Sequence, residues 1–310
     1  MPTNYQNTAA YRVVAAEGSA YFLKLRLDIL DNAALTVPRF LSAQSIRQVI
    51  VPISNRTGQL WVYWDDYNVI LYPFVAGQNA FASPLTGSQW REFGTALKRI
   101  HTSVVPPEMA GQLKRETFSP HWRERVARLL DYARQSDFTD PIAAELTKFM
   151  RANAAEIEYL VRRCEQLGRA LVDRPPEFVL CHSDLHAGNL LVDSGGSIYI
   201  VDWDNPILAP KESDLMFIGG GVGGIWNSAA EADLFYQGYG KAEINPAALA
   251  YYRMARILED IAPRAEQLLL TVLGADRGRT MLGIQRWFAP GGVVEMAHQA
   301  DGMLSLSSEG

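Results

Sequence analysis

The apolar residues of this chain follow two different periods, and the change from one to the other falls near residue 88. Before that point, residues 10–16 and 20–27 form two strand-like runs on either side of Glu17-Gly18-Ser19, which predicts a hairpin. Residues 61–67 and 68–75 predict two further strands. We therefore expect the N-terminal part of the chain to be rich in β-structure.

From Ser88 onward the apolar residues recur at helical spacing. The first apolar stripe ends near His101, and a second helix is expected to start at Ser119-Pro120. Pro141 opens another long helical run, which continues until Pro175-Pro176. Stripes of this kind predict packed helices far more often than ligand sites.

The last third of the chain is also predicted to be helical. Helices are expected over residues 229–239, from 246 to about 273, and from 280 to about 288. The last ten residues are rich in serine and glycine and are predicted to be frayed. An α+β protein follows, with a β-rich first part and a larger helical second part.

Between the predicted helices, three short apolar runs alternate with polar loops. The strand-like run that ends at Cys181 leads into a polar loop, and residues 190–192 and 198–201 form a hairpin around a turn at 193–196. Asp202 follows the hairpin directly. The chain therefore runs strand, loop, strand, turn, strand. One acid, Asp184, lies in the loop after the first strand, and another, Asp202, follows the last strand.

The polar loop fits the pattern H-x-D-x-x-x-x-N, in which four residues separate Asp184 from Asn189. An aspartate in such a loop can accept the proton of an attacking hydroxyl group. An amide oxygen and a second carboxylate, here Asp202, can hold Mg²⁺ against the phosphates of a nucleotide. Either acid alone would fit an ordinary turn equally well, but the complete pattern favours phosphoryl transfer.

The residues in and around this loop resemble one family in particular. Residues 181–189 read Cys-His-Ser-Asp-Leu-His-Ala-Gly-Asn and are followed by Ile-Val-Asp-Trp-Asp at 200–204, which differs from the His-Arg-Asp of protein kinases. This version resembles the aminoglycoside phosphotransferase family, whose members phosphorylate hydroxyl groups of small molecules. Residues 209–221, Ala-Pro-Lys-Glu-Ser-Asp-Leu-Met-Phe-Ile-Gly-Gly-Gly, are most similar to the spectinomycin phosphotransferases. The resemblance extends, more weakly, from about residue 8 to about residue 296.

The resemblance implies a two-lobed, protein-kinase-like fold. Residues 1–75 would form a small nucleotide-binding lobe, and residues 76–310 a helical lobe for catalysis and substrate binding. Asp184 would be the catalytic residue, and Asn189 and Asp202 would hold Mg²⁺ with ATP as the phosphate donor.

The resemblance also assigns residues of the first lobe to the nucleotide. Lys24 becomes the candidate for the α- and β-phosphates. Tyr72, Pro73 and Phe74 fall where the hinge of the family passes the adenine, with Pro73 stiffening the link. On the residues alone, Lys24 would be a surface position of a strand, and Pro73 would simply end an edge strand.

Two features near Lys24 depart from the kinase-like pattern. The segment 32–43 has no Glu to pair with the lysine, and Asn32 stands at the aligned position, with Asp28 and Asp31 as alternative partners. No Gly-rich loop precedes Lys24. Because Lys24 lies so near the start of the sequence, the first helix and strand of the family are expected to be missing, which predicts either a reading frame that begins late or a shortened first lobe with weakened nucleotide binding.

Acidic residues are the candidates for a cationic substrate. In aminoglycoside phosphotransferases, acids on C-terminal helices and loops meet the ammonium groups of the drug. The resemblance therefore makes Glu259 and Asp260 substrate-binding candidates, followed by Asp204 and Glu212. The ordinary role of such an acidic pair is to solvate the exposed face of a helix.

Composition limits the partners and the setting. The chain is 48% hydrophobic and 20% charged, and its net charge of −5 indicates neither a nucleic-acid surface nor a polybasic membrane patch. Cys164 and Cys181 make no disulfide framework and are expected to be buried free thiols. The sequence has no apparent signal peptide and no apolar run long enough to span a membrane. These features predict a cytoplasmic protein with no nucleic-acid or membrane partner.

Three other kinds of site fit the sequence less well. Residues 219–224 satisfy G-x-G-x-x-G, but a dinucleotide site needs a preceding strand and a following helix, so a flexible or closely packed loop is expected. A Walker A loop is absent. Cys181, His182 and His186 lack the further Cys or His pair that zinc requires, and His182 is expected to support the catalytic loop.

The sequence thus predicts ATP-dependent transfer of phosphate to a hydroxyl of an aminocyclitol such as spectinomycin. One alternative is a kinase of the same type that acts on choline, homoserine or a sugar. Another is a regulatory nucleotide-binding protein with little activity, which the short first lobe and the missing Glu would favour. The intact set of Asp184, Asn189 and Asp202 argues for an enzyme.

Overall fold

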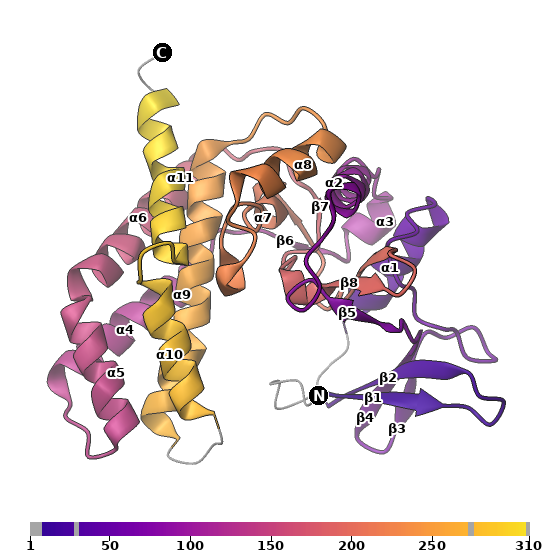
Figure 1. The fold of residues 1–310 in the computed structure, drawn as a ribbon, viewed down its shortest axis with the longest axis horizontal. Helices are drawn as coiled ribbons and strands as arrows, with labels where there is room; N and C mark the ends of the chain where they lie inside the picture. Colours follow the sequence, from indigo (N-terminus) through magenta and orange to yellow (C-terminus); the bar gives the residue numbers. More distant parts are fainter. Residues whose placement is uncertain (1–7, 28–30, 272–275, 308–310) are drawn as a thin grey trace. The chain divides into compact units, whose positions relative to one another are not determined.

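The computed structural model describes residues 8–27, 31–271 and 276–307, and the chain divides into two compact units. The first unit consists of Met1–Arg115, Phe178–Asp214 and Asp233–Ala242, and the second of Glu116–Glu177, Leu215–Ala232 and Glu243–Gly310. The strands lie in the first unit, while the second is built from helices (Figure 1). The predicted α+β composition is confirmed, and the lobe boundary between residues 75 and 76 stays a prediction.

The N-terminal sheet, whose strands are labelled in Figure 1, is antiparallel. Its four strands have the order β1-β2-β4-β3. These strands are β1 (Thr8–Val14), β2 (Ala20–Arg26), β3 (Val62–Trp64) and β4 (Tyr67–Pro73). The predicted hairpin is confirmed, since β1 pairs with β2 across a tight turn. Gly18 makes that turn possible, because its φ of +90° is strained for residues with a side chain. In this register Lys24 lies opposite Ile70 of β4.

Two small three-stranded sheets support the central loop of the first unit. One has the order β5-β8-β9 and the other β6-β10-β7. Their strands are β5 (Gly77–Asn79), β8 (Leu190–Asp193) and β9 (Ile198–Ile200), and β6 (Lys114–Arg115), β7 (Val179–Cys181) and β10 (Ile207–Ala209). The predicted hairpin of β8 and β9 is confirmed, and its turn is fastened by Asp193, which accepts backbone hydrogen bonds from Gly195 and Ser197.

The helices of the first unit begin with α1 (Ala33–Ala43), α2 (Gly87–His101) and α3 (Pro107–Ala110). Helix α2 starts at a capping box, in which Thr86 and Gln89 bond each other's backbone N–H. Its predicted apolar stripe is confirmed as core, because the side chains of Trp90, Phe93, Leu97 and Ile100 are all buried. The stripe fixes the direction of α2 and with it the position of His101 at the helix end.

Helix α8 (Ala229–Tyr239) packs its second half closely against α2. A Cβ atom on Gly94 would lie 2.1 Å from the carbonyl oxygen of Phe235, and one on Gly238 would lie 1.8 Å from that of Arg91. Only glycine at both positions permits this approach of the two backbones. The close crossing brings Tyr239 within reach of His101.

The second unit is a bundle around one long helix, α9 (Pro246–Leu270), which contacts its five other long helices. Those are α4 (His121–Gln135), α5 (Pro141–Ala152), α6 (Ala154–Asp173), α10 (Arg277–Trp287) and α11 (Val293–Ser307). Helix α9 is buried along a stripe that includes Met254, Leu258, Ile261 and Leu268. This stripe is what the helical period of the sequence predicted.

Two predictions about the helices were wrong. The run from Pro141 is two helices, because Asn153 leaves helical geometry at φ −103° and ψ 16° while the apolar period continues past it. The last ten residues were expected to be frayed, yet α11 continues to Ser307. It is anchored where Arg163 and Tyr159 bond Asp301. Predicted ends near residue 273 and beyond 307 lie outside the described residues.

Several other expectations about the chain were tested by the fold. Cys164 and Cys181 are buried free thiols, as predicted. Within the described ranges, every helix is too short or too polar to cross a lipid bilayer. The glycine run contains a short 3₁₀ turn, Val222–Gly224, which follows the helix α7 (Glu212–Leu215) instead of a strand. The expected loop is confirmed there, and the βαβ context of a dinucleotide site is absent from this described segment.

The start of α5 provides a pH-dependent contribution to stability. Asp140 caps α5 by accepting the backbone N–H of Ala143 at 2.8 Å, and it pairs with both terminal nitrogens of Arg277 at 2.6 and 2.8 Å. The hydrogen bonds from Arg277, followed by that from Ala143, lower the pKa of Asp140 from 3.8 to about 2. The ionised carboxylate therefore favours the folded state at any pH above its unfolded value.

We expect Asp140→Asn to be less stable than the parent protein at pH 6, because asparagine keeps the cap and loses the ion pair. The difference should shrink as pH falls from about 4 toward 2, since the parent carboxylate becomes protonated in that window. Urea unfolding at a series of pH values measures it. A difference that stayed constant down to the acid limit would contradict this assignment.

Candidate active site

The polar loop lies between β7 and β8, which belong to different small sheets of the first unit. It ends in a 3₁₀ turn at Ala187–Asn189. Ser183 and Asp202 have φ values of 69° and 65°, a left-handed conformation that is uncommon for residues other than glycine. Surrounding contacts must hold both residues in place, and such held strain is concentrated at functional sites.

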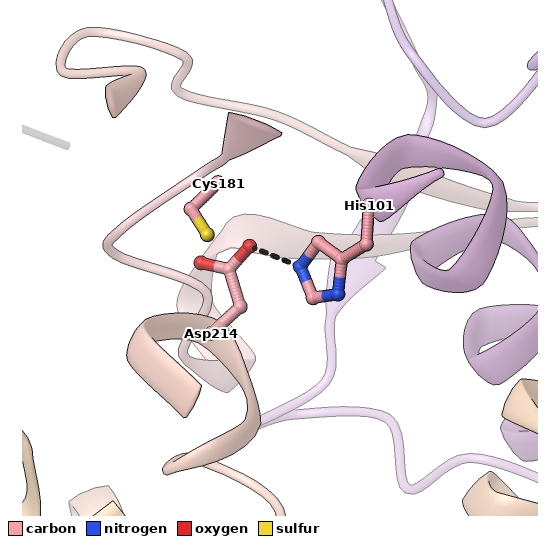
Figure 2. A group of neighbouring side chains, drawn as sticks. All are labelled: His101, Cys181 and Asp214. Atoms are coloured by element: carbon pink, nitrogen blue, oxygen red, sulfur yellow. Dashed lines mark hydrogen bonds and ion pairs between the residues drawn. The ribbon is translucent and has the colours of Figure 1, made fainter. Parts of the chain in front are cut away.

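Asp214 holds the start of this loop. Its carboxylate accepts the backbone N–H of His182 at 2.9 Å and that of Ser183 at 2.7 Å. The Nε2 atom of His101 lies 3.0 Å from the same carboxylate (Figure 2), and Nδ1 of that ring lies 2.7 Å from the hydroxyl of Tyr239. Because Asp214 is fully buried, this network fixes the strained backbone at Ser183.

His101, Cys181 and Asp214 also form a compact group of potential metal ligands, with ligand atoms within 4.8 Å of one another (Figure 2). Their atoms already serve as hydrogen-bond partners, however. The thiol of Cys181 lies 3.6 Å from the carbonyl oxygens of Ala209 and Pro210, and Asp214 binds the loop backbone. The group therefore has a structural role in supporting the loop.

His182 supports the loop from inside, as predicted. Its Nε2 lies 2.9 Å from the carbonyl oxygen of Val201, and its Nδ1 accepts the backbone N–H of Asp184 at 3.3 Å. The ring packs against Trp203, with 4.6 Å between centroids. His182 thus ties the loop to the segment that carries Asp202, since Val201 and Trp203 flank that acid.

Asp184 is partly accessible, with 31% of its side chain exposed. The Nδ2 group of Asn189 donates to the backbone carbonyl of Asp184 at 2.8 Å and lies 3.3 Å from Oδ2 of Asp184. His186 accepts the N–H of Gly188 through Nδ1, which leaves the ring proton on Nε2, 3.6 Å from the same Oδ2. The carboxylate of Asp184 therefore has the amide of Asn189 and the ring of His186 as neighbours.

A cavity of about 350 Å³ lies within the first unit, a size in the range of roughly 300–1,000 Å³ that is typical of ligand pockets. Six predicted site residues line it, namely Lys24, Tyr72, Pro73, Phe74, Asn189 and Asp202. Apolar side chains complete the lining, among them Phe22, Pro38, Ile50, Leu191 and Val201. The cavity therefore joins an apolar region to the charged groups of Lys24 on β2 and of Asp202, which follows β9.

Lys24 is buried, with 8% of its surface exposed, and is surrounded by acids. Its Nζ lies 2.7 Å from Oδ1 of Asp202 and 2.7 Å from both carboxylate oxygens of Asp204. Burial lowers the pKa of Lys24, but the charges of Asp202 and Asp204 outweigh burial and leave that pKa raised. Lys24 therefore stays positively charged inside the cavity, as a group that binds phosphate must.

The predicted hinge forms one wall of the cavity. Tyr72 and Pro73 end strand β4, and the guanidinium of Arg12 lies 5.1 Å from the ring centre of Phe74. Burial raises the pKa of the Tyr72 hydroxyl, and the charges of Asp204 and Asp202 raise it further. The phenol is therefore neutral and can act only as a polar, hydrogen-bonding group.

The oxygen atoms of Asn189 and Asp202 that line the cavity are suitable ligands for Mg²⁺. Asn189 donates through Nδ2 to Asp184, which leaves its amide oxygen as an acceptor, and Asp202 contributes a carboxylate to the same cavity. Mg²⁺ prefers such oxygen ligands and usually uses one or two carboxylates together with substrate phosphates. The two residues therefore fit a magnesium ion.

Comparison with known proteins decides the family. A family model described as phosphotransferase enzyme family matches residues 5–254 of the chain. The chain belongs to this family. Because members transfer phosphate to small molecules, the predicted family and enzyme class are confirmed, and the chain is a small-molecule phosphotransferase.

Solved structures confirm the kinase-like fold of this phosphotransferase. It is 38% identical to spectinomycin phosphotransferase APH(9)-Ia in complex with ADP and spectinomycin, with a TM-score of 0.90 over 97% of this chain and 92% of that chain. It is 39% identical to the AMP-bound complex of APH(9)-Ia, with a TM-score of 0.84 over 93% and 90%. Choline kinase LicA from Streptococcus pneumoniae shares the fold alone, at 14% identity and a TM-score of 0.55 over 89% of each chain.

The acids predicted to bind substrate lie in different surroundings. Asp204 faces Lys24 in the first unit of the phosphotransferase. Glu212 is fully buried, with one carboxylate oxygen 3.1 Å from Nζ of Lys211, so its side chain has no surface to offer a ligand. Glu259 and Asp260 lie on α9 in the second unit, where only Glu259 is exposed.

Asp260 is already neutralised within its own helix. Its carboxylate lies 3.0 Å from Nε of Arg256 and 2.7 Å from Nη1 of Arg264, one turn away on either side. Two arginines around one carboxylate leave little negative potential for a cationic drug. The sequence spacing of these residues contains this information, because positions four apart on a helix are neighbours.

Some residues near the site were not predicted from the sequence. Arg26 lies 3.2 Å from Asp204, and its position two residues after Lys24 on β2 is a signal that strand alternation provides. His101 contacts Asp214 and Tyr239, both from distant parts of the chain, and no local sequence pattern predicts these two contacts. Asp31 pairs with Lys114 and not with Lys24, while Asp28 lies outside the described residues.

Proposed function

We propose that this phosphotransferase transfers the γ-phosphate of ATP to a hydroxyl group of an aminocyclitol antibiotic, with spectinomycin as the first candidate. The observation that carries the proposal is the shared cavity of Lys24, Asn189 and Asp202, with Asp184 bonded to Asn189 beside it. The likeness to a structure that contains ADP and spectinomycin, at 38% identity, supports the choice of donor and acceptor.

The nucleotide would occupy the 350 Å³ cavity. Its apolar lining suits an adenine ring, and backbone groups of Tyr72, Pro73 and Phe74 would read the edge of the base. The charged Nζ of Lys24 would hold the α- and β-phosphates. Asn189 and Asp202 would hold magnesium, which when bound neutralises the charge that develops on the transferred phosphoryl group.

Asp184 would act on the acceptor. Its carboxylate orients the attacking hydroxyl group and takes up its proton, while the hydroxyl oxygen forms a bond to the γ-phosphorus. The bond between that phosphorus and the β–γ bridging oxygen breaks, and ADP leaves with the bond's electron pair. Asn189, which also donates to the backbone carbonyl of Asp184, would help to orient the carboxylate, and most of the rate would come from such positioning.

The drug's ammonium groups require acids that remain accessible. Of the four acids predicted for this role, Asp204 is paired with Lys24 and Arg26, Asp260 is paired with two arginines, Glu212 is buried, and Glu259 is exposed. We therefore keep Glu259 as the substrate-binding proposal and leave Glu212 out of it. A reaction that consumes ATP and inactivates an antibiotic would take place in the cytoplasm.

Release of ADP by the purified protein tests this function. Mg-ATP would be supplied with spectinomycin, streptomycin, kanamycin, hygromycin or choline in separate reactions, and Asp184→Ala would measure the background. We expect ADP release above background with spectinomycin only. Release with another compound would keep the reaction and change the substrate, and silence with all five compounds would contradict the proposed acceptor class.

A further inference from the structure

The lysine of the cavity has no acidic partner on the first helix. Helix α1 contains no Asp or Glu, and Asn32 stands at its N-cap. Asp31 accepts the backbone N–H of Ala33 at 3.0 Å, and its other oxygen lies 3.6 Å from Nζ of Lys114. Kinase-like folds pair this lysine with a glutamate on the first helix. In this chain the carboxylate that pairs with Lys24 must come from another segment.

The structure shows two carboxylates at Lys24, both from the segment that follows β9. Asp202 contributes one oxygen at 2.7 Å, whereas Asp204 contributes both of its oxygens at 2.7 Å. The contacts span 178 and 180 residues of sequence. Asp204 therefore contacts the ammonium group through two oxygens, whereas Asp202 contacts it through one.

A second cation holds Asp204 in this position. Arg26 follows Lys24 by two residues on β2, so both side chains leave the same face of the strand. Nη1 of Arg26 lies 3.2 Å from Oδ2 of Asp204. Asp204 therefore bridges two cations of one strand and stays anchored to β2 through Arg26 if Lys24 shifts toward a ligand.

Asp202 and Asp204 cannot both remain paired with Lys24 during the reaction. In the proposed function Asp202 holds magnesium, which draws its charge away from Lys24. A buried cation that loses its only partner is strongly destabilised, and Lys24 is 8% exposed. Among the partners described for Lys24, Asp204 is the one that remains.

We propose that Asp204 is the lasting partner of Lys24, which positions the ammonium group for the nucleotide phosphates in place of a glutamate on the first helix. This inference rests on the proposed role of Lys24 as a phosphate ligand. It replaces the role of drug ligand that the sequence predicted for Asp204, and it makes Asp204 a positioning residue that acts through Lys24.

A double-mutant cycle in nucleotide binding tests the inference without any acceptor. The variants are Asp204→Asn, Lys24→Met and the double variant, with calorimetric titration of each by the non-hydrolysable analogue AMP-PNP in the presence of Mg²⁺. We expect Asp204→Asn alone to bind about tenfold more weakly, the size expected for a lost charge-assisted contact. In the Lys24→Met background the same change should cause no further weakening, because its target is gone.

Equal weakening by Asp204→Asn in both backgrounds, or no weakening in either, would overturn the inference. Thermal unfolding of each variant shows whether the protein remains folded, and asparagine is chosen because it keeps the shape of aspartate. If spectinomycin is the acceptor, Asp204→Asn should leave the KM for spectinomycin unchanged. A selective rise in that KM would return Asp204 to the drug site.

This cycle separates the inference from the proposed function. A panel without any active acceptor would contradict the proposed substrate class, yet the coupling between Lys24 and Asp204 would still appear in nucleotide binding. A shift in the Mg²⁺ concentration needed for binding, independent of Lys24, would instead make Asp204 a metal ligand and overturn the inference.

Discussion

Asp184→Asn is expected to lower kcat by about 10²–10⁴-fold, the usual contribution of a positioned general base. Asparagine cannot accept the proton of the attacking hydroxyl group, although it has nearly the same shape and can still bond Asn189. Nucleotide binding should change little, because Lys24, Asn189 and Asp202 line the nucleotide cavity and remain intact. ADP release with the active acceptor measures kcat, and calorimetry measures the nucleotide Kd.

Asp193→Asn provides a matched control for this experiment. Asp193 fastens the turn of the neighbouring hairpin by accepting the N–H groups of Gly195 and Ser197 at 2.9 and 2.8 Å. Asparagine makes the same kind of turn contact, so this variant should retain its activity. If Asp184→Asn kept normal turnover, Asp184 would not be the base and the proposed mechanism would be wrong.

Asp202→Asn is the second change with a large expected effect. It removes one negative charge from the proposed magnesium site, and loss of a group that stabilises the transferring phosphoryl typically costs on the order of 10²–10³-fold in kcat. The Mg²⁺ concentration that gives half-maximal activity should also rise, because an amide is a weaker ligand than a carboxylate for this ion. A titration of activity with Mg²⁺ measures both effects.

The choice of asparagine at this position matters. Asp202 has a φ of 65°, and asparagine tolerates that left-handed conformation far better than most residues. Any loss in Asp202→Asn therefore comes from the charge and not from the backbone. A variant with reduced kcat but an unchanged Mg²⁺ dependence would indicate that Asp202 acts through Lys24, to which it is bonded at 2.7 Å, and not as a metal ligand.

Three of the candidate site residues that the sequence predicted lie in one short stretch. Asp184, Asn189 and Asp202 belong to a loop and a hairpin whose strands are marked by apolar runs and a glycine turn. Their spacing is set by local geometry, because β8 and β9 pair directly with each other. The helices were predictable for the same reason, since the apolar period of α2 and α9 reflects which face of each helix is buried.

Local patterns failed where an interruption or an anchor came from elsewhere. The apolar period runs past Asn153, so the break between α5 and α6 was invisible to it. Helix α11 lacks a strong apolar pattern near its end. It is held by Asp301, which bonds Arg163 and Tyr159 of α6 across 138 and 142 residues.

The sequence by itself therefore determined the fold class and the family, and it located the candidate residues Asp184, Asn189 and Asp202. Tertiary structure decided which charges meet. Lys24 finds Asp202 and Asp204 across 178 and 180 residues, and His101 finds Asp214 across 113. The reason is physical: strand and helix preferences arise from neighbouring residues, whereas the partner of a buried charge is fixed only when the folded chain excludes water around it.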